Sequence, residues 1–171
     1  YVFSDSDWGG TERDRRSTSG GCVMLGEHCI KTWSATQQAY ALSSAEAELY
    51  GLVEAVTRGK GLVTLSSELG FSELSGMLRL GTDSSAAKSF VCRRGLGRMR
   101  HLQIRDLWLQ KEVAEGRVEV NKVPGGSNPA DLMTKYLSQE TMLEHCREPN
   151  MEFTSGRAEA CLLYTSDAAD E

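Results

Sequence analysis

Four acidic residues stand at points where the chain is expected to leave a strand or to enter a helix. They are Asp5, Glu48, Asp83 and Asp131. Hard divalent cations such as Mg²⁺ prefer oxygen ligands, and a pair of these ions needs several carboxylates from distant parts of a chain. One acidic residue on each of several elements is the pattern that such a centre leaves in a sequence. The pattern predicts a metal-dependent centre, although the chain holds 24 Asp and Glu in all and composition alone places some at element ends.

The N-terminal part of the chain is expected to form three strands and then one long helix. The strands cover residues 1–6, 20–26 and 28–34. A polar, Gly-rich loop joins the first two strands, which favours a meander. The helix runs from about Ser44 to Leu69, where Ser43 and Glu46 fit a capping box and Gly70 a stop.

The remainder of the chain alternates between strands and helices. Strands are expected at 77–80 and 117–123, and helices at 86–92, 101–113, 130–137 and 138–146. Ser84 or Ser85 would cap the first of these helices, and Ser127 or Asn128 the third. A meander followed by alternating elements predicts a mixed sheet with helices on its faces. Ligands of such sheets bind beyond the strand ends, so Asp5 and Asp83, which both end strands, are expected to meet.

The bulk properties fit one globular domain. The chain has 171 residues, 40% hydrophobic content and 25% charged residues. No apolar run approaches the length that spans a membrane, so no membrane partner is expected. Its net charge of −5 argues against a free-standing, high-affinity nucleic-acid binder. Five cysteines without a CxxC pair argue against a zinc site or a disulfide framework and favour a reducing compartment.

Several motifs, taken in order, closely resemble those of one enzyme family. They are FSDSDW at 3–8, DRRSTSGG at 14–21, ALSSAEAEL at 41–49, TDSSAA at 82–87, RHLQIRDLWLQ at 100–110 and KVPGGSNPADLMTKYL at 122–137. Together they resemble the ribonuclease H domain of copia-type long-terminal-repeat retrotransposons. The resemblance covers roughly residues 2–137 and implies an α/β, ribonuclease H-like fold, with a mixed five-stranded sheet and helices on both faces. It also implies hydrolysis of the RNA strand of RNA–DNA hybrids during reverse transcription.

The resemblance also implies which residues are catalytic and bind metal. It assigns these roles to Asp5, Glu48, Asp83 and Asp131. Asp7 remains a near alternative to Asp5, and periodicity does not separate Glu48 from Glu46, so the motif alone favours Glu48. The implied cofactor is a pair of Mg²⁺ ions, with Mn²⁺ as a substitute. One ion would activate a water molecule and the other would stabilise the leaving 3′ oxygen.

Basic residues near the middle of the chain are candidates for gripping the nucleic acid. Ser84, Arg93, Arg94, Arg98 and Arg100 form the expected nucleic-acid-binding set. In the family, the segment that corresponds to RHLQ usually has an aspartate two residues after its histidine. In this chain that position is Gln103, two residues after His101. Cellular ribonucleases H often carry a histidine in the loop before the last aspartate, and the loop PGGSNP has none.

Three segments are expected along the chain. Residues 1–137 would form the ribonuclease H-like domain, 138–160 a helical or loose extension, and 161–171 (CLLYTSDAADE) an adapter-derived artefact of DNA library preparation. We expect the chain to be a module of a longer polyprotein, located in the cytoplasm within a virus-like particle. Its expected partners are the RNA–DNA hybrid and the upstream reverse transcriptase domain. The alternative function is a catalytically decayed structural module of a reverse transcriptase.

Overall fold

The computed structural model describes residues 1–11, 13–71, 76–97, 102, 104–147 and 149–151. The strands are β1 (Val2–Ser6), β2 (Thr18–Leu25), β3 (His28–Thr36), β4 (Leu78–Thr82) and β5 (Val118–Lys122). The α-helices are α1 (Ser44–Glu68), α2 (Ser85–Val91), α3 (Ile104–Ala114) and α4 (Gln139–Arg147), and two 3-10 helices are η2 (Gly125–Ser127) and η3 (Pro129–Met133). The order of elements agrees with the order expected from the sequence.

The strands form one mixed five-stranded sheet in the order β3-β2-β1-β4-β5. The β1–β2 and β2–β3 pairs are antiparallel, as expected of a meander. The β1–β4 and β4–β5 pairs are parallel, and helices make the connections that parallel strands require. Since β1 lies at the centre of the sheet, its residues have neighbours on both sides.

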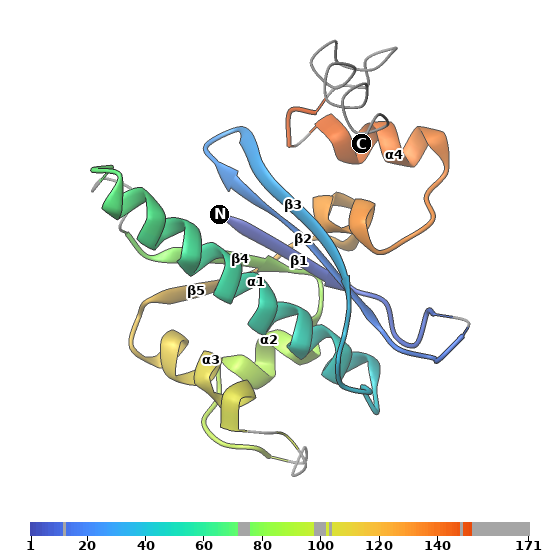
Figure 1. Ribbon diagram of the computed structural model, residues 1–171. Coiled ribbons are helices and arrows are strands. Elements are labelled where there is room, and N and C mark those ends of the chain that lie inside the picture. Colours follow the sequence, from blue (N-terminus) through green and yellow to red (C-terminus); the bar gives the residue numbers. More distant parts are fainter. Residues whose placement is uncertain (12, 72–75, 98–101, 103, 148, 152–171) are drawn as a thin grey trace, which may run out of the picture.

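Helices cover both faces of the sheet (Figure 1). Side chains of a strand alternate between the two faces. Val2 and Val23 therefore point into the larger core beneath α1, α2 and α3, whereas Phe3 and Cys22 belong to a smaller core with Ala130 of η3. Helix α4 packs against η3 on this second side. The predicted fold class is confirmed.

Helix α1 packs very close to the sheet because two glycines of the helix face the strands. A Cβ atom added at Gly59 would lie 2.7 Å from Cγ2 of Val2 and 2.9 Å from Cδ2 of Leu78. Gly51 faces Ser4 in the same way, with Oγ 3.1 Å from the added Cβ. At the start of the helix the Ser43 side chain accepts a hydrogen bond from the Glu46 amide, as the capping box predicts. The Glu46 carboxylate accepts from the Leu42 amide at 3.0 Å, one residue earlier than such a box requires.

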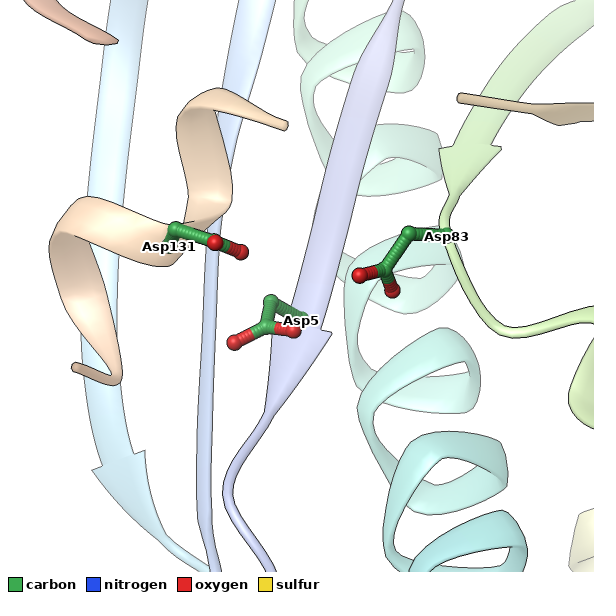
Figure 2. Close-up of side chains that lie close together, drawn as sticks. All are labelled: Asp5, Asp83 and Asp131. Atoms are coloured by element: carbon green, nitrogen blue, oxygen red, sulfur yellow. The ribbon is translucent and has the colours of Figure 1, made fainter. Parts of the chain in front are cut away.

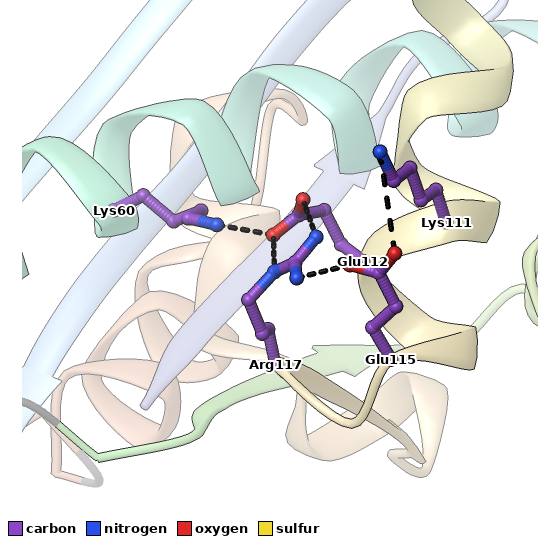
Figure 3. Close-up of polar contacts among 5 residues, drawn as sticks. All are labelled: Lys60, Lys111, Glu112, Glu115 and Arg117. Atoms are coloured by element: carbon purple, nitrogen blue, oxygen red, sulfur yellow. Dashed lines mark hydrogen bonds and ion pairs between the residues drawn. The ribbon is translucent and has the colours of Figure 1, made fainter.

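An ion-pair network joins α1, α3 and the start of β5 (Figure 3). Glu112 is buried, with 3% of its surface exposed. The Arg117 guanidinium donates to both of its carboxylate oxygens, at 2.9 and 2.6 Å, and Lys60 of α1 pairs with it from the other side. Hydrogen bonds from Arg117, followed by Lys60, lower the pKa of Glu112 to about 2. The network fixes α3 against α1 through charged groups.

The element after β5 is shorter than the sequence predicts. A helix was expected over 130–137, but η3 ends at Met133. The Asp131 carbonyl accepts from the amides of both Thr134 and Lys135, which closes the last turn, and the non-helical backbone of Thr134 (φ −127°) ends the helix there. Ser138 then caps α4 by accepting a hydrogen bond from the Thr141 amide. Among the helices described, none is long and apolar enough to cross a membrane.

Candidate metal centre

Three aspartates from separate elements converge at one edge of the sheet (Figure 2). Asp5 lies on β1, Asp83 directly follows β4, and Asp131 lies in η3. One carboxylate oxygen of each lies within 4.8 Å of those of the other two. Such spacing lets one or two cations contact all three side chains.

The parallel pairing of β1 and β4 brings Asp5 and Asp83 together. Val2 pairs with Leu80 and Phe3 with Gly81, so the two strands reach the same edge in step. Asp5 is three residues beyond Val2, and Asp83 is three residues beyond Leu80. The sequence-based expectation that neighbouring strand ends would join these residues is confirmed.

Asn128 and Gly20 bring Asp131 to the same place. Asn128 is fully buried, and its Nδ2 donates to the Ser4 carbonyl at 3.0 Å while its Oδ1 accepts from the Ala130 amide. It therefore caps η3 and fixes it to β1. Gly20 pairs with Asp5, and a Cβ atom at this glycine would lie 2.6 Å from Cβ of Met133. The absence of a side chain there lets η3 rest directly on the sheet.

Glu48, the fourth predicted ligand, lies on α1, which packs against β1. Burial, followed by the charges of Asp5 and Asp83, raises the pKa of Glu48 to about 8. Its Oε2 atom is buried and has no hydrogen-bond partner. Glu46, the alternative, instead accepts from the Tyr50 hydroxyl at 2.6 Å and from the Leu42 amide. Glu48 therefore feels the charges of Asp5 and Asp83, although it is not one of the three carboxylates within 4.8 Å of one another, and Glu46 is used at the helix start.

Asp5 is the most enclosed member of the cluster, with 1% of its surface exposed. Burial raises its pKa to about 6 against the hydrogen bond that the Thr134 hydroxyl donates to Oδ2. Lys135 adds a positive charge, with Nζ 3.3 Å from Oδ1 of Asp5. Asp7, the alternative to Asp5, accepts a hydrogen bond from the Thr18 amide and closes the loop between β1 and β2.

The donor set fits divalent cations. All four side chains offer carboxylate oxygens, which are the ligands that Mg²⁺ and Mn²⁺ prefer. Oδ1 of Asp131 and Oε2 of Glu48 are buried without a partner. Buried polar atoms without partners are rare in folded proteins, and a bound cation would give both of these oxygens a partner.

Sequence comparisons relate this chain to transposon polyproteins. The retrovirus-related Pol polyprotein from transposon RE2 of Arabidopsis thaliana is 30% identical over 141 residues, which is 81% of this chain. That from transposon TNT 1-94 of Nicotiana tabacum is 26% identical over 151 residues, or 85% of the chain. The chain is homologous to the Pol polyproteins of copia-type transposons. It spans 10% and 11% of the length of these two relatives.

The sheet order β3-β2-β1-β4-β5 and the alternation of helices and strands agree with the architecture that the resemblance implies. A solved structure, the N-terminal RNase H domain of Rv2228c from Mycobacterium tuberculosis fused to maltose-binding protein, aligns with 85% of this chain and 96% of its own. Its sequence identity is 17% and its TM-score 0.46. No protein-family model matches the chain.

Two of the residues expected to grip nucleic acid, Ser84 and Arg93, have local roles within the protein. Ser84 caps α2 by accepting a hydrogen bond from the Ala87 amide at 3.2 Å. Arg93 lies over the Phe90 ring at 4.8 Å and donates to the Leu96 carbonyl, so part of its donor capacity is used within the protein. Arg94 is exposed. Arg98 and Arg100 lie outside the described residues, as do His101, Gln103 and the expected artefact at 161–171.

Sequence reasoning missed three residues of the centre. Thr134 and Lys135 contact Asp5, and Asn128 fixes η3 to β1. The spacing of Asp131 and Lys135, four residues apart, was a usable signal for an ion pair on a helical turn. The contact of Asn128 with β1 could not be predicted from the sequence. An Asn that caps a helix with its Oδ1 is expected from sequence alone, but the sequence does not show which group its Nδ2 contacts.

Proposed function

We propose that this Pol segment hydrolyses the RNA strand of RNA–DNA hybrids with the aid of two divalent cations. The observation that carries the proposal is the convergence of three aspartates, within 4.8 Å, at the strand edge of a ribonuclease H-like sheet. The homologous Pol polyproteins come from retrovirus-related transposons, which supports a substrate formed in reverse transcription.

Each acidic residue has a defined task in this proposal. Asp5, at the middle of the cluster, would hold the cations together with Asp83 and Asp131, which flank it. Glu48 would add an oxygen from α1. Cations bound there supply an activated water molecule and stabilise the leaving 3′ oxygen. Thr134 holds one Asp5 oxygen by a hydrogen bond, and this fixes the direction of the other. No nucleophilic side chain is needed.

The hybrid would be recognised by its shape and its 2′-hydroxyl groups, without reading of base sequence. The exposed Arg94 and the segment that holds Arg98 and Arg100 are proposed to contact phosphates. The reverse transcriptase domain of the same polyprotein would supply further grip, because the net charge of −5 gives this segment little attraction for nucleic acid of its own.

The test is cleavage of an RNA–DNA hybrid labelled on each strand, with Mg²⁺ or Mn²⁺, by the chain and by Asp83→Asn. We expect metal-dependent cutting of the RNA strand and a loss of about a hundredfold or more in the variant, since each ligand contributes to metal affinity and to activity. Glu119→Gln is the matched control, because Glu119 lies on β5 in an exposed ion pair with Arg79. Its rate should equal that of the unaltered chain.

Two results would contradict the proposal. A folded chain that binds divalent cations and hybrid yet never cuts, even when joined to its polymerase, would favour the decayed structural module. Equal cutting by Asp83→Asn would place the chemistry elsewhere.

A further inference from the structure

A lysine ammonium lies among the carboxylates of the candidate metal centre. Nζ of Lys135 is 2.9 Å from Oδ2 of Asp131 and 3.3 Å from Oδ1 of Asp5. The two carboxylate side chains are 9% and 2% exposed, whereas that of Lys135 is 41% exposed. The cation therefore reaches into a buried anionic site from a solvent-facing stem.

The backbone keeps this ammonium close to the centre. The Lys135 amide donates to the Asp131 carbonyl at 3.0 Å, which continues the turn of η3 and places the two side chains on one face. Among the residues that the structure describes, no other Lys or Arg forms an ion pair with Asp5, Asp83 or Asp131. Carboxylates gathered in one site repel one another unless a cation is present. The positive charge of Lys135 reduces this repulsion in the metal-free protein.

We propose that Lys135 is a tethered counter-ion, which occupies a cation position in the metal-free protein and is displaced when divalent cations bind. The inference rests on the metal centre of the proposed function. Its ammonium contacts oxygens of both Asp5 and Asp131, two of the three side chains that a shared cation would contact. Its exposed, flexible stem lets it leave without any movement of η3.

Displacement has a thermodynamic consequence. The carboxylates must release the ammonium before they bind metal. The apparent Kd for metal is therefore the intrinsic Kd divided by the fraction of the protein in which the site is free of the ammonium. Removing the ammonium should therefore strengthen metal binding. A salt bridge with a purely structural role would leave metal affinity unchanged or weaken it through distortion of η3.

Calorimetric titration with Mn²⁺ tests the inference on the chain, on Lys135→Met and on Lys31→Met. Methionine keeps the length of the stem and removes the charge. Lys31 is the control because it is an exposed lysine that pairs with Val23, far along the sheet from the Gly20–Asp5 pair. We expect the Kd for Mn²⁺ to fall about tenfold in Lys135→Met, a coupling of ordinary size, and to stay constant in Lys31→Met. An unchanged or larger Kd in Lys135→Met overturns the inference.

Amine footprinting of the unaltered chain is a second test that needs no variant to fold. The rate of Lys135 acetylation is measured by mass spectrometry with and without Mg²⁺, with Lys31 as the internal standard. Displacement predicts acetylation of Lys135 several times faster with Mg²⁺, and an equal or slower rate overturns it. If the chain bound neither Mg²⁺ nor Mn²⁺, the proposed function itself would fail. If it bound them with Lys135 still shielded, the displacement alone would fail.

Discussion

At the residue scale, Glu48 and Asp5 make the metal-free site sensitive to pH. The pKa of Glu48 is about 8 in the folded protein, against an ordinary value of 4.5. Between these values the folded state keeps a proton that the unfolded state has lost, so the free energy of unfolding falls as pH rises. Asp5 acts in the same direction between 3.8 and about 6. The carboxylates of the candidate metal centre therefore lower stability at neutral pH while no cation is bound.

The substitution Glu48→Gln tests this effect, because the amide does not titrate. In the presence of EDTA, we expect the variant to be more stable than the unaltered chain by about 1–3 kcal/mol near the upper pKa, and the difference to vanish near pH 4.5. Thermal unfolding followed across this pH range measures it. Added Mg²⁺ should stabilise the unaltered chain more than the variant. Parallel stability curves for the two proteins would contradict the assignment.

At the element scale, two glycines of α1 differ in what an added side chain would do. At Gly61 only the helix propensity of the backbone would change, whereas at Gly59 packing against the sheet would change as well. Gly59 faces Val2 and Leu78 at less than the distance a Cβ atom needs, whereas Gly61 has open space around it. Alanine in an exposed helix interior is more favourable than glycine by roughly 0.5–1 kcal/mol. At the buried position, overpacking reverses the sign by about 1–3 kcal/mol.

The substitutions Gly59→Ala and Gly61→Ala form a matched pair on one helix. We expect Gly61→Ala to raise the free energy of unfolding and Gly59→Ala to lower it, as measured by urea denaturation. Equal effects of both variants would show that α1 is not held against the sheet as closely as described.

Some helices and strands could be predicted from the sequence, and others could not. The strands and the long helix followed from alternation, apolar periodicity and the Ser43 cap, which are local features. The end of η3 did not, because it depends on Gly20 of a distant strand and on the contact of Thr134 with Asp5. The choice of Asp5 over Asp7 was also not local, since only the fold shows that Asp7 accepts from the Thr18 amide at the loop.

At the scale of the whole molecule, Glu112 links the helical layer to the sheet. Its pKa of about 2 lies below the ordinary 4.5, so it stabilises the folded state fully above pH 4.5, and this contribution is lost as pH falls toward 2. We expect Glu112→Gln to lower the free energy of unfolding at neutral pH by about 1–3 kcal/mol, because Arg117 and Lys60 lose a buried, charged acceptor.

Chemical denaturation at neutral and acidic pH checks this prediction. The variant should lose less stability than the unaltered chain between pH 4.5 and pH 2. Glu119→Gln is again the control, since Glu119 and Arg79 are 44% and 63% exposed and such pairs contribute about 0–1 kcal/mol. A Glu112→Gln variant as stable as this control would show that the network does not hold α3 in place.

The bond between Asn128 and Ser4 cannot form until most of the chain has been synthesised. It joins residues 124 positions apart, so at about 5–20 residues per second the ribosome needs roughly 6–25 s to make its second partner after its first. Until then a nascent chain can carry Asp5, Glu48 and Asp83 but has no η3 to deliver Asp131. On the proposed function, a partly translated polypeptide would therefore be unable to cut the RNA strand of a hybrid.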